Sequence, residues 1–437
     1  MQKSEVAARL ARLVAEEGGR AYFVGGFVRD FVRGKPSGDY DIEVHGVSRE
    51  RLFALLQTLG TVQSVGVSFG IFILPEWDMD VALPRTESRI GPGHRDFEIT
   101  ADPSLCIRDA AKRRDFTVNA MMMDVLTGQI FDPFGGKEDL KRGVLRHVSD
   151  LTFAEDALRV LRGAQFAARF GFSLADETLA LCRTIDLSCL SRERVEQEMK
   201  KALLQAEKPS AFFEVLRRAN ALRFWFSELA QTVGVEQDRI FHPEGDVWTH
   251  TMQVLDRAAL LRSEAKQPYA FMLLALCHDF GKITASFEKD GRIHAYGHET
   301  AGLPLVQSFL ERLTGNHRVR RYVCNMVRLH MKPNRMICDG AGLTAFCRTF
   351  DEACEPSDLI LFSCADDEKT EKAALFEKYA QFQARMAQPF VTGKDLIRAG
   401  IAPGENMKTL LQLAHKLRVA GVCREAALKQ VLAAAKR

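Results

Sequence analysis

Residues 21–45 read AYFVGGFVRDFVRGKPSGDYDIEVH, and this stretch decides the fold of the N-terminal part of the chain. Its first apolar run predicts a strand that ends at Gly25-Gly26, and its last predicts a strand that carries Asp39 and Asp41. Strand side chains alternate between faces, so the two carboxylates point the same way while Tyr40, Ile42 and Val44 point into a core. The order strand, glycines, helix, strand therefore brings the glycines and the carboxylates close together.

The residue types in this stretch are those of phosphoryl transfer. Two carboxylates held side by side repel unless a cation lies between them, and Mg²⁺ takes one or two carboxylates together with substrate phosphates. Gly25 and Gly26 allow close approach of the backbone, and the N-terminus of the following helix, which bears Arg29, attracts anions. Either pattern alone is typical of a turn or a solvated strand end. Asp80, in a later strand-like run, is a third candidate carboxylate, with an ordinary strand-end charge as the alternative.

Length and composition bound the class of protein. The chain has 437 residues, which predicts about three domains. Its net charge of +3 excludes wholesale electrostatic coating of nucleic acid, so any polyanion site must be local. The ten cysteines include no C-x-x-C pair, which indicates thiols of a reducing compartment. With no signal-peptide pattern and no apolar run long enough to span a bilayer, we expect a cytoplasmic protein without a membrane partner.

Two further stretches lie between residues 84 and 119. The run Arg85–Arg95 mixes glycine, proline and alternating charge, which predicts a mobile flap, or else a plain solvated loop. Three consecutive cations, residues 112–114, are followed by Asp115 and Asn119, which share one face of a predicted helix. We interpret the cations as triphosphate ligands and Asp115 with Asn119 as ligands of sugar hydroxyls. A surface charge cluster is the alternative.

Beyond residue 153 the apolar spacing predicts helices. Asp156 and Arg159 stand one helical turn apart on a shared face. Such a pair is usually an ordinary ion pair of the helix surface. The alternative interpretation is that the two side chains together present donors and acceptors to the edge of a nucleobase.

A second candidate site follows residue 240. Histidines and aspartates recur at the ends of predicted helices, and imidazoles and carboxylates that converge in this way make an open site for a divalent metal. One such histidine alone is usually a capped core residue. The candidate ligands are His250, His278, Asp279, His298, His330 and Asp366.

The ordered motifs of the first half carry a resemblance to a known family. They are Gly25-Gly26-x-Val-Arg-Asp, Asp39-x-Asp41, Arg113-Arg114-Asp115-x-x-x-Asn119, Asp132-Pro-x-Gly-Gly and Glu155-Asp156-x-x-Arg159. In these motifs the chain resembles the bacterial class II tRNA nucleotidyltransferases, the CCA-adding enzymes and their poly(A) polymerase relatives. The resemblance implies an α+β fold, with a small polymerase-β-like head followed by an all-helical neck and body, a helical HD domain and a helical tail.

The resemblance also implies roles and partners. Asp39 and Asp41 would be catalytic and hold Mg²⁺, and the enzyme would add C, C and A to tRNA from CTP and ATP without a template. The rivals are an enzyme that adds only A or only C-C, a poly(A) polymerase, a phosphohydrolase with an RNA-binding head, and an RNA-binding scaffold. The chain departs from many members at Gln165, where they carry an arginine. The implied nucleotide-binding residues are Gly25, Gly26, Arg29, Arg114, Asp115, Asn119, Asp156, Arg159 and Arg162.

The second site resembles the HD phosphohydrolase domain that some of these enzymes carry. The resemblance implies hydrolysis of nucleoside 2′-phosphates or 2′,3′-cyclic phosphates, with Lys282 assisting phosphate binding; His242, His294 and His317 stay unassigned. The sequence predicts neither the metal of this site nor the oligomeric state. The expected domains are 1–148 (head), 149–235 (neck and body), 236–370 (HD domain) and 371–437 (tail).

Overall fold

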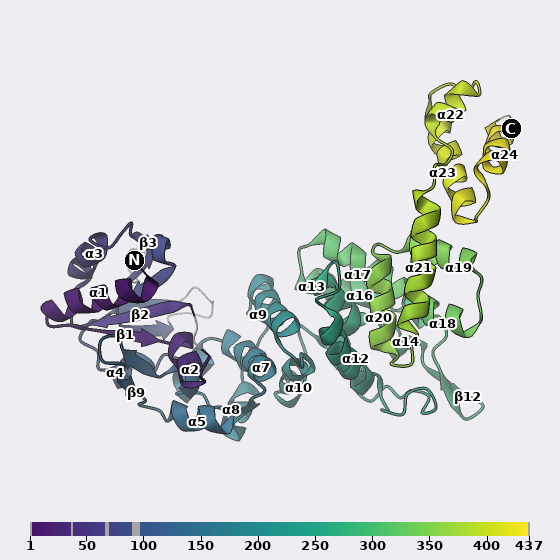
Figure 1. Cartoon of the computed structure of the whole chain (residues 1–437). Helices are drawn as coiled ribbons and strands as arrows, with labels where there is room; N and C mark the ends of the chain where they lie inside the picture. Colours follow the sequence, from purple (N-terminus) through teal and green to yellow (C-terminus); the bar gives the residue numbers. More distant parts are fainter. Residues whose placement is uncertain (1, 36–37, 66–69, 90–96, 436–437) are drawn as a thin grey trace. The chain divides into compact units, whose positions relative to one another are not determined.

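The computed structural model describes residues 2–35, 38–65, 70–89 and 97–435. The chain forms two compact units (Figure 1). Unit 1 contains residues 1–202 and 211–224, and unit 2 contains residues 203–210 and 225–437. The chain therefore enters unit 2, returns to unit 1 and enters unit 2 again.

A mixed sheet is the centre of unit 1. Its strand order is β3-β4-β5-β2-β1-β8-β9, with β2 antiparallel to β1 and parallel to β5. The strands are β1 (Arg20–Val24), β2 (Tyr40–His45), β3 (Gln63–Val65), β4 (Ile71–Leu74), β5 (Met79–Ala82), β8 (Met122–Asp124) and β9 (Ile130–Phe131).

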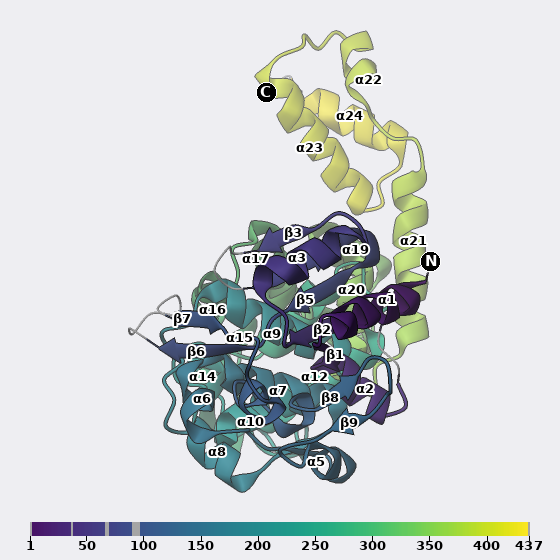
Figure 2. The same cartoon turned by 90° about the vertical axis from the view of Figure 1, so that its left-hand side faces the viewer.

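Both faces of this sheet are covered by other parts of unit 1, which explains why its central strands are rich in apolar residues. On one face, Ile42 and Val44 are buried, and α1 (Lys3–Glu16) packs against β1 and against α3 (Arg49–Gln57), as seen in Figure 2. The prediction of a core is thus confirmed for Ile42 and Val44, whereas Tyr40, the third residue of that prediction, is half-buried. On the other face, Tyr22 belongs to an apolar cluster whose buried members are Tyr22, Val24, Ala110, Ala111, Ala120 and Met122. The carboxylates of β2 lie on this second face.

The expected flap has more regular structure than a loop. Residues Arg85–Arg89 form β6, which pairs in antiparallel register with β7 (Phe97–Ala101). The prediction of a loop was wrong for these residues, because the charged and threonine residues at alternate positions suit a two-stranded ribbon. Residues 90–95 of the predicted flap lie outside the described residues.

Helices make up most of the rest of unit 1. They follow the sheet in sequence, with a short 3₁₀ helix η2 (Thr117–Asn119) before β8, and a two-stranded pair of β10 (Val144–Leu145) and β11 (Ser173–Leu174). The α-helices are α2 (Gly26–Val32), α4 (Ile107–Ala111), α5 (Gly136–Arg142), α6 (Asp150–Glu155), α7 (Leu158–Phe170), α8 (Asp176–Cys182), α9 (Arg192–Gln205), which continues into unit 2, and α10 (Ser210–Arg218).

Unit 2 is almost entirely helical. Apart from the hairpin of β12 (Phe287–Lys289) and β13 (Arg292–His294), its elements are helices. The helices before the tail are α11 (Ser227–Ala230), α12 (Val247–Leu261), α13 (Pro268–Cys277), α14 (Lys282–Ala285), α15 (His298–Ala301), α16 (Leu303–Leu313), α17 (His317–Leu329), α18 (Lys332–Cys338), α19 (Leu343–Glu352) and α20 (Pro356–Asp366).

The C-terminal helices have an apolar cluster of their own. The buried members of this cluster include Leu396, Leu410 and Val431. The helices concerned are α21 (Lys372–Ala387), α22 (Gly393–Arg398), α23 (Glu405–Val419) and α24 (Arg424–Ala435). The predicted α+β architecture with helical parts behind it is confirmed. Among the described residues, no helix combines the length and the apolar character that crossing a membrane requires.

Residues of unit 2 that precede position 236 are tied to its main helices. Ser210 donates from its backbone N–H and its hydroxyl to the two carboxylate oxygens of Asp256, at 3.0 and 2.7 Å. Arg262 donates to the carbonyl of Ala206 at 2.7 Å. Arg312 forms an ion pair with the buried Glu228. Unit 2 therefore begins well before α12.

Candidate active sites

The carboxylates of β2 gather at one end of the sheet. Asp39 directly precedes β2, Asp41 lies within it, and Asp41 is in register with Asp80 of the parallel strand β5. Burial, and then the charge of Asp39, raise the pKa of Asp41. Burial and Asp39 also raise the pKa of Asp80. The three carboxylates thus repel one another, and a divalent cation with oxygen ligands would relieve that repulsion.

Gly25 brings the backbone to these carboxylates. It has φ +67°, a conformation that favours glycine. A Cβ added at Gly25 would lie 3.4 Å from Nη1 of Arg114 and 3.7 Å from Oδ2 of Asp41. The peptide, a guanidinium and a carboxylate therefore converge on one point, as a site for a phosphate with its metal requires.

Glu43 is a buried member of this cluster that the sequence reasoning missed. It is fully buried on the face that carries Asp41, and its Oε2 lies 2.8 Å from Nη2 of Arg113 and 3.5 Å from Nη2 of Arg114. Its Oε1 lies 3.1 Å from Nε2 of His45. Burial alone would raise the pKa of Glu43, but the hydrogen bond with His45 and the charges of Arg114 and Arg113 lower it to about 2. The carboxylate therefore fixes the basic cluster above the sheet. The signal was its place in the alternation that begins at Asp39.

Asp115 and Asn119 meet as predicted, but through a different local structure. Asn119 Nδ2 donates to Asp115 Oδ1 at 2.9 Å, and the intervening residues form the 3₁₀ helix η2 where an α-helix was expected. Arg162 donates to Asp115 Oδ2 from Nε at 2.8 Å. Burial would raise the pKa of Asp115, but Arg162 and the hydrogen bond from Asn119 hold it below its usual value. The pair is thus a buried, ionised network beside the arginines.

Arg29 belongs to the same network. It is 7% exposed, and it donates to both carboxylate oxygens of Asp30 and, from Nη1 at 2.9 Å, to Asn119 Oδ1. Its guanidinium carbon lies 4.6 Å from the ring centroid of Phe170. These contacts orient the Asn119 amide.

Asp156 and Arg159 take separate partners. Asp156 precedes α7, and its two carboxylate oxygens accept hydrogen bonds from Nη2 of Arg194 at 3.0 Å each. Arg159 Nη2 donates to the carbonyl of Arg113 at 2.7 Å, and Arg159 also contacts the carbonyl of Thr152. The predicted base-reading pair is thus held by Arg194 on one side and by the arginine segment on the other. Arg194, on α9, carried no local sequence signal that pointed to Asp156.

The four histidines among the candidate metal ligands each place Nδ1 next to an oxygen. Three of them place Nδ1 next to a backbone carbonyl three residues earlier: His278 at 3.0 Å, His298 at 2.8 Å and His330 at 2.7 Å. His250 places Nδ1 2.7 Å from Oε1 of Glu244. In the tautomer that donates from Nδ1 to these oxygens, the neutral imidazole has its lone pair on Nε2. This is the second-shell arrangement of metal-ligating histidines.

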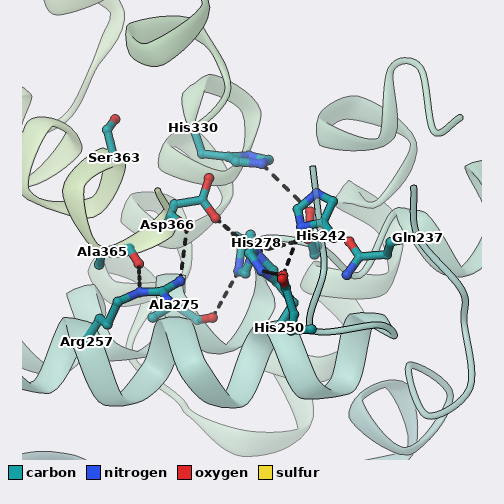
Figure 3. A network of polar contacts seen from close by, with 12 residues as sticks. Gln237, His242, His250, Arg257, Ala275, His278, His330, Ser363, Ala365 and Asp366 are labelled. Atoms are coloured by element: carbon teal, nitrogen blue, oxygen red, sulfur yellow. Dashed lines mark hydrogen bonds and ion pairs between the residues drawn. The ribbon is translucent and has the colours of Figure 1, made fainter. Parts of the chain in front are cut away.

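The four Nε2 atoms converge on two aspartates, and Figure 3 shows His250, His278 and Asp366 pointing toward one another. Asp366 Oδ1 lies 3.1 Å from His250 Nε2 and 3.5 Å from His278 Nε2. Asp279 Oδ2 lies 3.2 Å from His278 Nε2, and its Oδ1 lies 3.1 Å from His298 Nε2 and 3.9 Å from His330 Nε2. The structure brings together all six predicted ligands, from five helical segments.

The donor set fits a divalent metal. Nε2 of His278 is buried and has no hydrogen-bond partner among the described residues. Nε2 of His298 and Nε2 of His330 lie 3.3 Å apart. Two lone pairs that face each other at this distance repel, and an ion that accepts both removes the repulsion. Among the described residues, the groups of at least three donor side chains that lie within 4.8 Å of one another are all in unit 2.

The surroundings of the metal site include residues that the sequence analysis left unassigned or overlooked. Glu244 Oε1 bridges Nδ1 of His242, at 3.0 Å, and Nδ1 of His250. Lys282 lies 2.7 Å from Asp279 Oδ2 and donates to Gln237 at 2.6 Å. Burial would raise the pKa of Asp279, but the charges of Lys282 and His278 hold it well below its usual range. The Pro-Glu sequence after His242 was the available signal for Glu244.

Comparison with known proteins agrees with this division into two sites. The family described as "Poly A polymerase head domain" matches residues 21–146, and the family described as "HD domain" matches residues 247–371. Both are families of metal-dependent enzymes. The first match contains Gly25, Asp41 and Arg114, and the second contains all six histidine and aspartate ligands of unit 2.

Curated relatives extend over nearly the whole chain. A "Multifunctional CCA protein" of Nitrosococcus oceani is 37% identical over 404 residues, which cover 90% of this chain and 95% of that protein. The chain belongs to the multifunctional CCA protein family. Another member, from Xanthomonas campestris, is 40% identical over 325 residues, which cover 72% of this chain and 76% of that protein. The predicted family and the predicted class of enzyme, a CCA-adding nucleotidyltransferase, are confirmed.

Solved structures of CCA-adding enzymes share the fold of this member of the multifunctional CCA protein family. A Thermotoga maritima CCA-adding enzyme complexed with tRNA matches with a TM-score of 0.66 and 22% identity, covering 98% of this chain and 95% of that one. A Bacillus stearothermophilus CCA-adding enzyme in complex with CTP matches with a TM-score of 0.65 and 22% identity, covering 100% and 98%. The roles of individual residues stay predictions.

Proposed function

We propose that this protein adds C, C and A to the 3′ end of tRNA from CTP and ATP without a nucleic-acid template, and that its HD domain is a metal-dependent phosphohydrolase. The observation that carries the first activity is the convergence of Gly25, Asp41 and Arg114 in a chain that is 37% identical to a multifunctional CCA protein over nearly its full length. The cytoplasmic location stays a prediction.

In the head, Asp39 and Asp41 would hold Mg²⁺. When bound, the ion would lower the pKa of the attacking hydroxyl and offset phosphate charge. The chain's own part is to position the nucleotide. Arg114, fixed by Glu43, would contact the triphosphate, and the peptide at Gly25 would approach it closely.

We assign the sugar and the base of the incoming nucleotide to the two networks beside that cluster. Asp115 and Asn119 lie next to the arginine segment and would accept and donate hydrogen bonds to the ribose hydroxyls. Asp156 presents its carboxylate with Arg194, and together they would contact the edge of cytosine or adenine. A site built to hydrogen-bond one edge rejects bases that leave its polar groups unpaired.

In the HD domain, His250, His278, Asp279, His298, His330 and Asp366 would hold one or two divalent ions. A bound ion would lower the pKa of a water so that it becomes a hydroxide near neutral pH. Lys282, which lies beside Asp279, would bind a substrate phosphate. Arg257 donates to the carbonyls of Ala365 and Asp366 and so fixes the end of α20 that carries the last ligand. We assign nucleoside 2′-phosphates and 2′,3′-cyclic phosphates as the substrate class.

The decisive experiment incubates the purified protein with three tRNA transcripts, truncated before the first C, before the second C and before A, each with CTP, ATP or both. Full CCA addition extends all three transcripts to the same mature end and then stops. Extension of only the last transcript would indicate an A-adding enzyme, extension that ends after C-C would indicate a CC-adding enzyme, and an unlimited A tail would indicate a poly(A) polymerase.

A further inference from the structure

Exposed aromatic rings flank the HD site. Phe241 is 72% exposed, Tyr296 is 73% exposed and Phe287 is 44% exposed. Scattered exposed apolar residues need no explanation, but several aromatic rings gathered on two neighbouring segments are unusual for a protein surface. The segments are residues 238–242, before α12, and the β12–β13 hairpin with the residues that follow it (Figure 1).

The two segments are joined to each other. Arg292, on β13, lies with Nε 2.7 Å from Asp238 Oδ2. Its guanidinium carbon lies 5.6 Å from the ring centroid of Phe241. On the hairpin side, the rings of His294 and Tyr296 stack with centroids 5.1 Å apart and planes 21° apart, and Phe287 lies 5.8 Å from Tyr296. The rings therefore form one aromatic surface.

Two rings of this aromatic surface are next in sequence to residues that contact the candidate metal ligands. Tyr296 follows Ala295, whose carbonyl lies 2.8 Å from Nδ1 of the metal ligand His298. Phe241 precedes His242, whose Nδ1 shares the Glu244 oxygen with the metal ligand His250. Tyr296 and Phe241 are thus each one residue away from a group that orients or contacts a metal-ligating histidine.

We propose that Phe241 and Tyr296, with Phe287 and His294 behind them, bind the nucleobase of the HD-domain substrate by stacking. The proposal rests on the proposed phosphohydrolase function. In a nucleoside 2′-phosphate the base and the phosphate are attached to adjacent carbons of the ribose, so a phosphate at Lys282 and the metal ligands keeps the base near the same site. Flat aromatic faces bind any base by stacking. The surface therefore selects nucleoside phosphates over phosphate esters that lack a base.

The test compares two phosphate monoesters of secondary alcohols, adenosine 2′-phosphate and glycerol 2-phosphate. Stacking on a protein ring contributes about 5- to 150-fold in affinity per base. The ratio compared is kcat/KM for adenosine 2′-phosphate divided by kcat/KM for glycerol 2-phosphate. In Tyr296→Ala and in Phe241→Ala this ratio should therefore fall by about 5- to 150-fold. Tyr296→Phe should retain the ratio. Leu260→Ala is the matched control. It removes an apolar side chain that is 76% exposed on α12, outside the aromatic surface, and it should also retain the ratio.

The same variants separate the two sources of the base. An oligoribonucleotide that carries a 2′-phosphate on its last nucleotide is assayed beside the free nucleotide. A loss with both substrates supports stacking of a terminal nucleotide from either source. If kcat/KM falls with only one of these two substrates, the result supports stacking and shows whether the base belongs to a free nucleotide or to an RNA end. An unchanged ratio with both, or an equal fall for glycerol 2-phosphate, overturns the proposal.

A binding measurement keeps this proposal independent of the hydrolytic activity. Saturation transfer from the protein to the adenine protons of adenosine 2′-phosphate is recorded by NMR in EDTA, for the wild type and for Tyr296→Ala. A weaker transfer in the variant supports the surface, and an equal transfer overturns it. If the wild type hydrolyses neither monoester, the phosphohydrolase function fails while this measurement still decides on stacking.

Discussion

Replacement of Glu43 by glutamine gives a quantitative test of the buried charge cluster. Glutamine has the shape of a protonated glutamate, so Glu43→Gln removes the charge that faces Arg113 and Arg114 and little else. The pKa of this carboxyl falls from 4.5 to about 2 on folding. A buried group with that difference contributes about 3 kcal/mol of stability at neutral pH.

The sign of the pH dependence follows from the direction of the change. Because the folded-state pKa is the lower one, the contribution is complete above pH 4.5 and is lost as the pH falls through about 2. The difference in stability between wild type and Glu43→Gln should therefore shrink from about 3 kcal/mol at pH 7 to about 1 kcal/mol at pH 3. A loss of packing alone would not depend on pH in this range.

Hydrogen exchange followed by mass spectrometry isolates the effect to unit 1. Peptides from β2 should exchange roughly 200-fold faster in Glu43→Gln at pH 7, after correction for intrinsic rates, while peptides from α13 in unit 2 stay unchanged. Glu17→Gln, which removes an exposed ion pair with Arg51 in the same unit, is the control and should leave β2 protection as it is. Equal exchange in wild type and Glu43→Gln, or a difference that is the same at both pH values, would refute the reasoning.

Three other predictions concern the two sites. Asp41→Asn should lower nucleotide incorporation into truncated tRNA by at least about 10²-fold while phosphatase activity persists; loss of both activities in folded protein would contradict two separate sites. Asp156→Ala should relax the choice of CTP and ATP over UTP and GTP in incorporation assays, because the carboxylate held by Arg194 is gone, and unchanged selectivity would exclude base reading by this residue. His278→Ala should weaken binding of a divalent metal by about 10- to 100-fold in calorimetric titration and abolish phosphatase activity while tRNA extension continues; full metal binding would remove His278 from the ligand set.

Local patterns in the sequence predicted those parts of the sites that local geometry determines. Asp39 and Asp41 are two residues apart at the start of β2, and the candidate ligand histidines of unit 2 recur at helix ends, so their residue types and spacing indicated the chemistry. Glu43 continues the alternation that begins at Asp39, but its charge pairing with Arg113 spans 70 residues along the chain, and no local pattern reveals that pairing. Arg194 was missed for the same reason, since its partner Asp156 is 38 residues away. Residues 85–89 were mistaken for a loop because the nearby sequence Gly91-Pro92-Gly93 is typical of turns, and that composition outweighed the alternation of Arg85, Glu87 and Arg89.

The path of the chain between the units has a consequence for attempts to separate the two activities. A fragment that starts at residue 236, the expected domain boundary, would lack Ser210, Ala206 and Glu228, which are partners of Asp256, Arg262 and Arg312. Asp256 would then keep a half-buried carboxylate with neither of the donors that hold it. Recombinant hydrolase made by one cut at that position should therefore express poorly, and swapping the two catalytic halves among relatives would need breakpoints on both sides of residues 211–224. Because the segments of the two units alternate along the chain, a single cut in the gene cannot yield two fragments that each contain one whole unit.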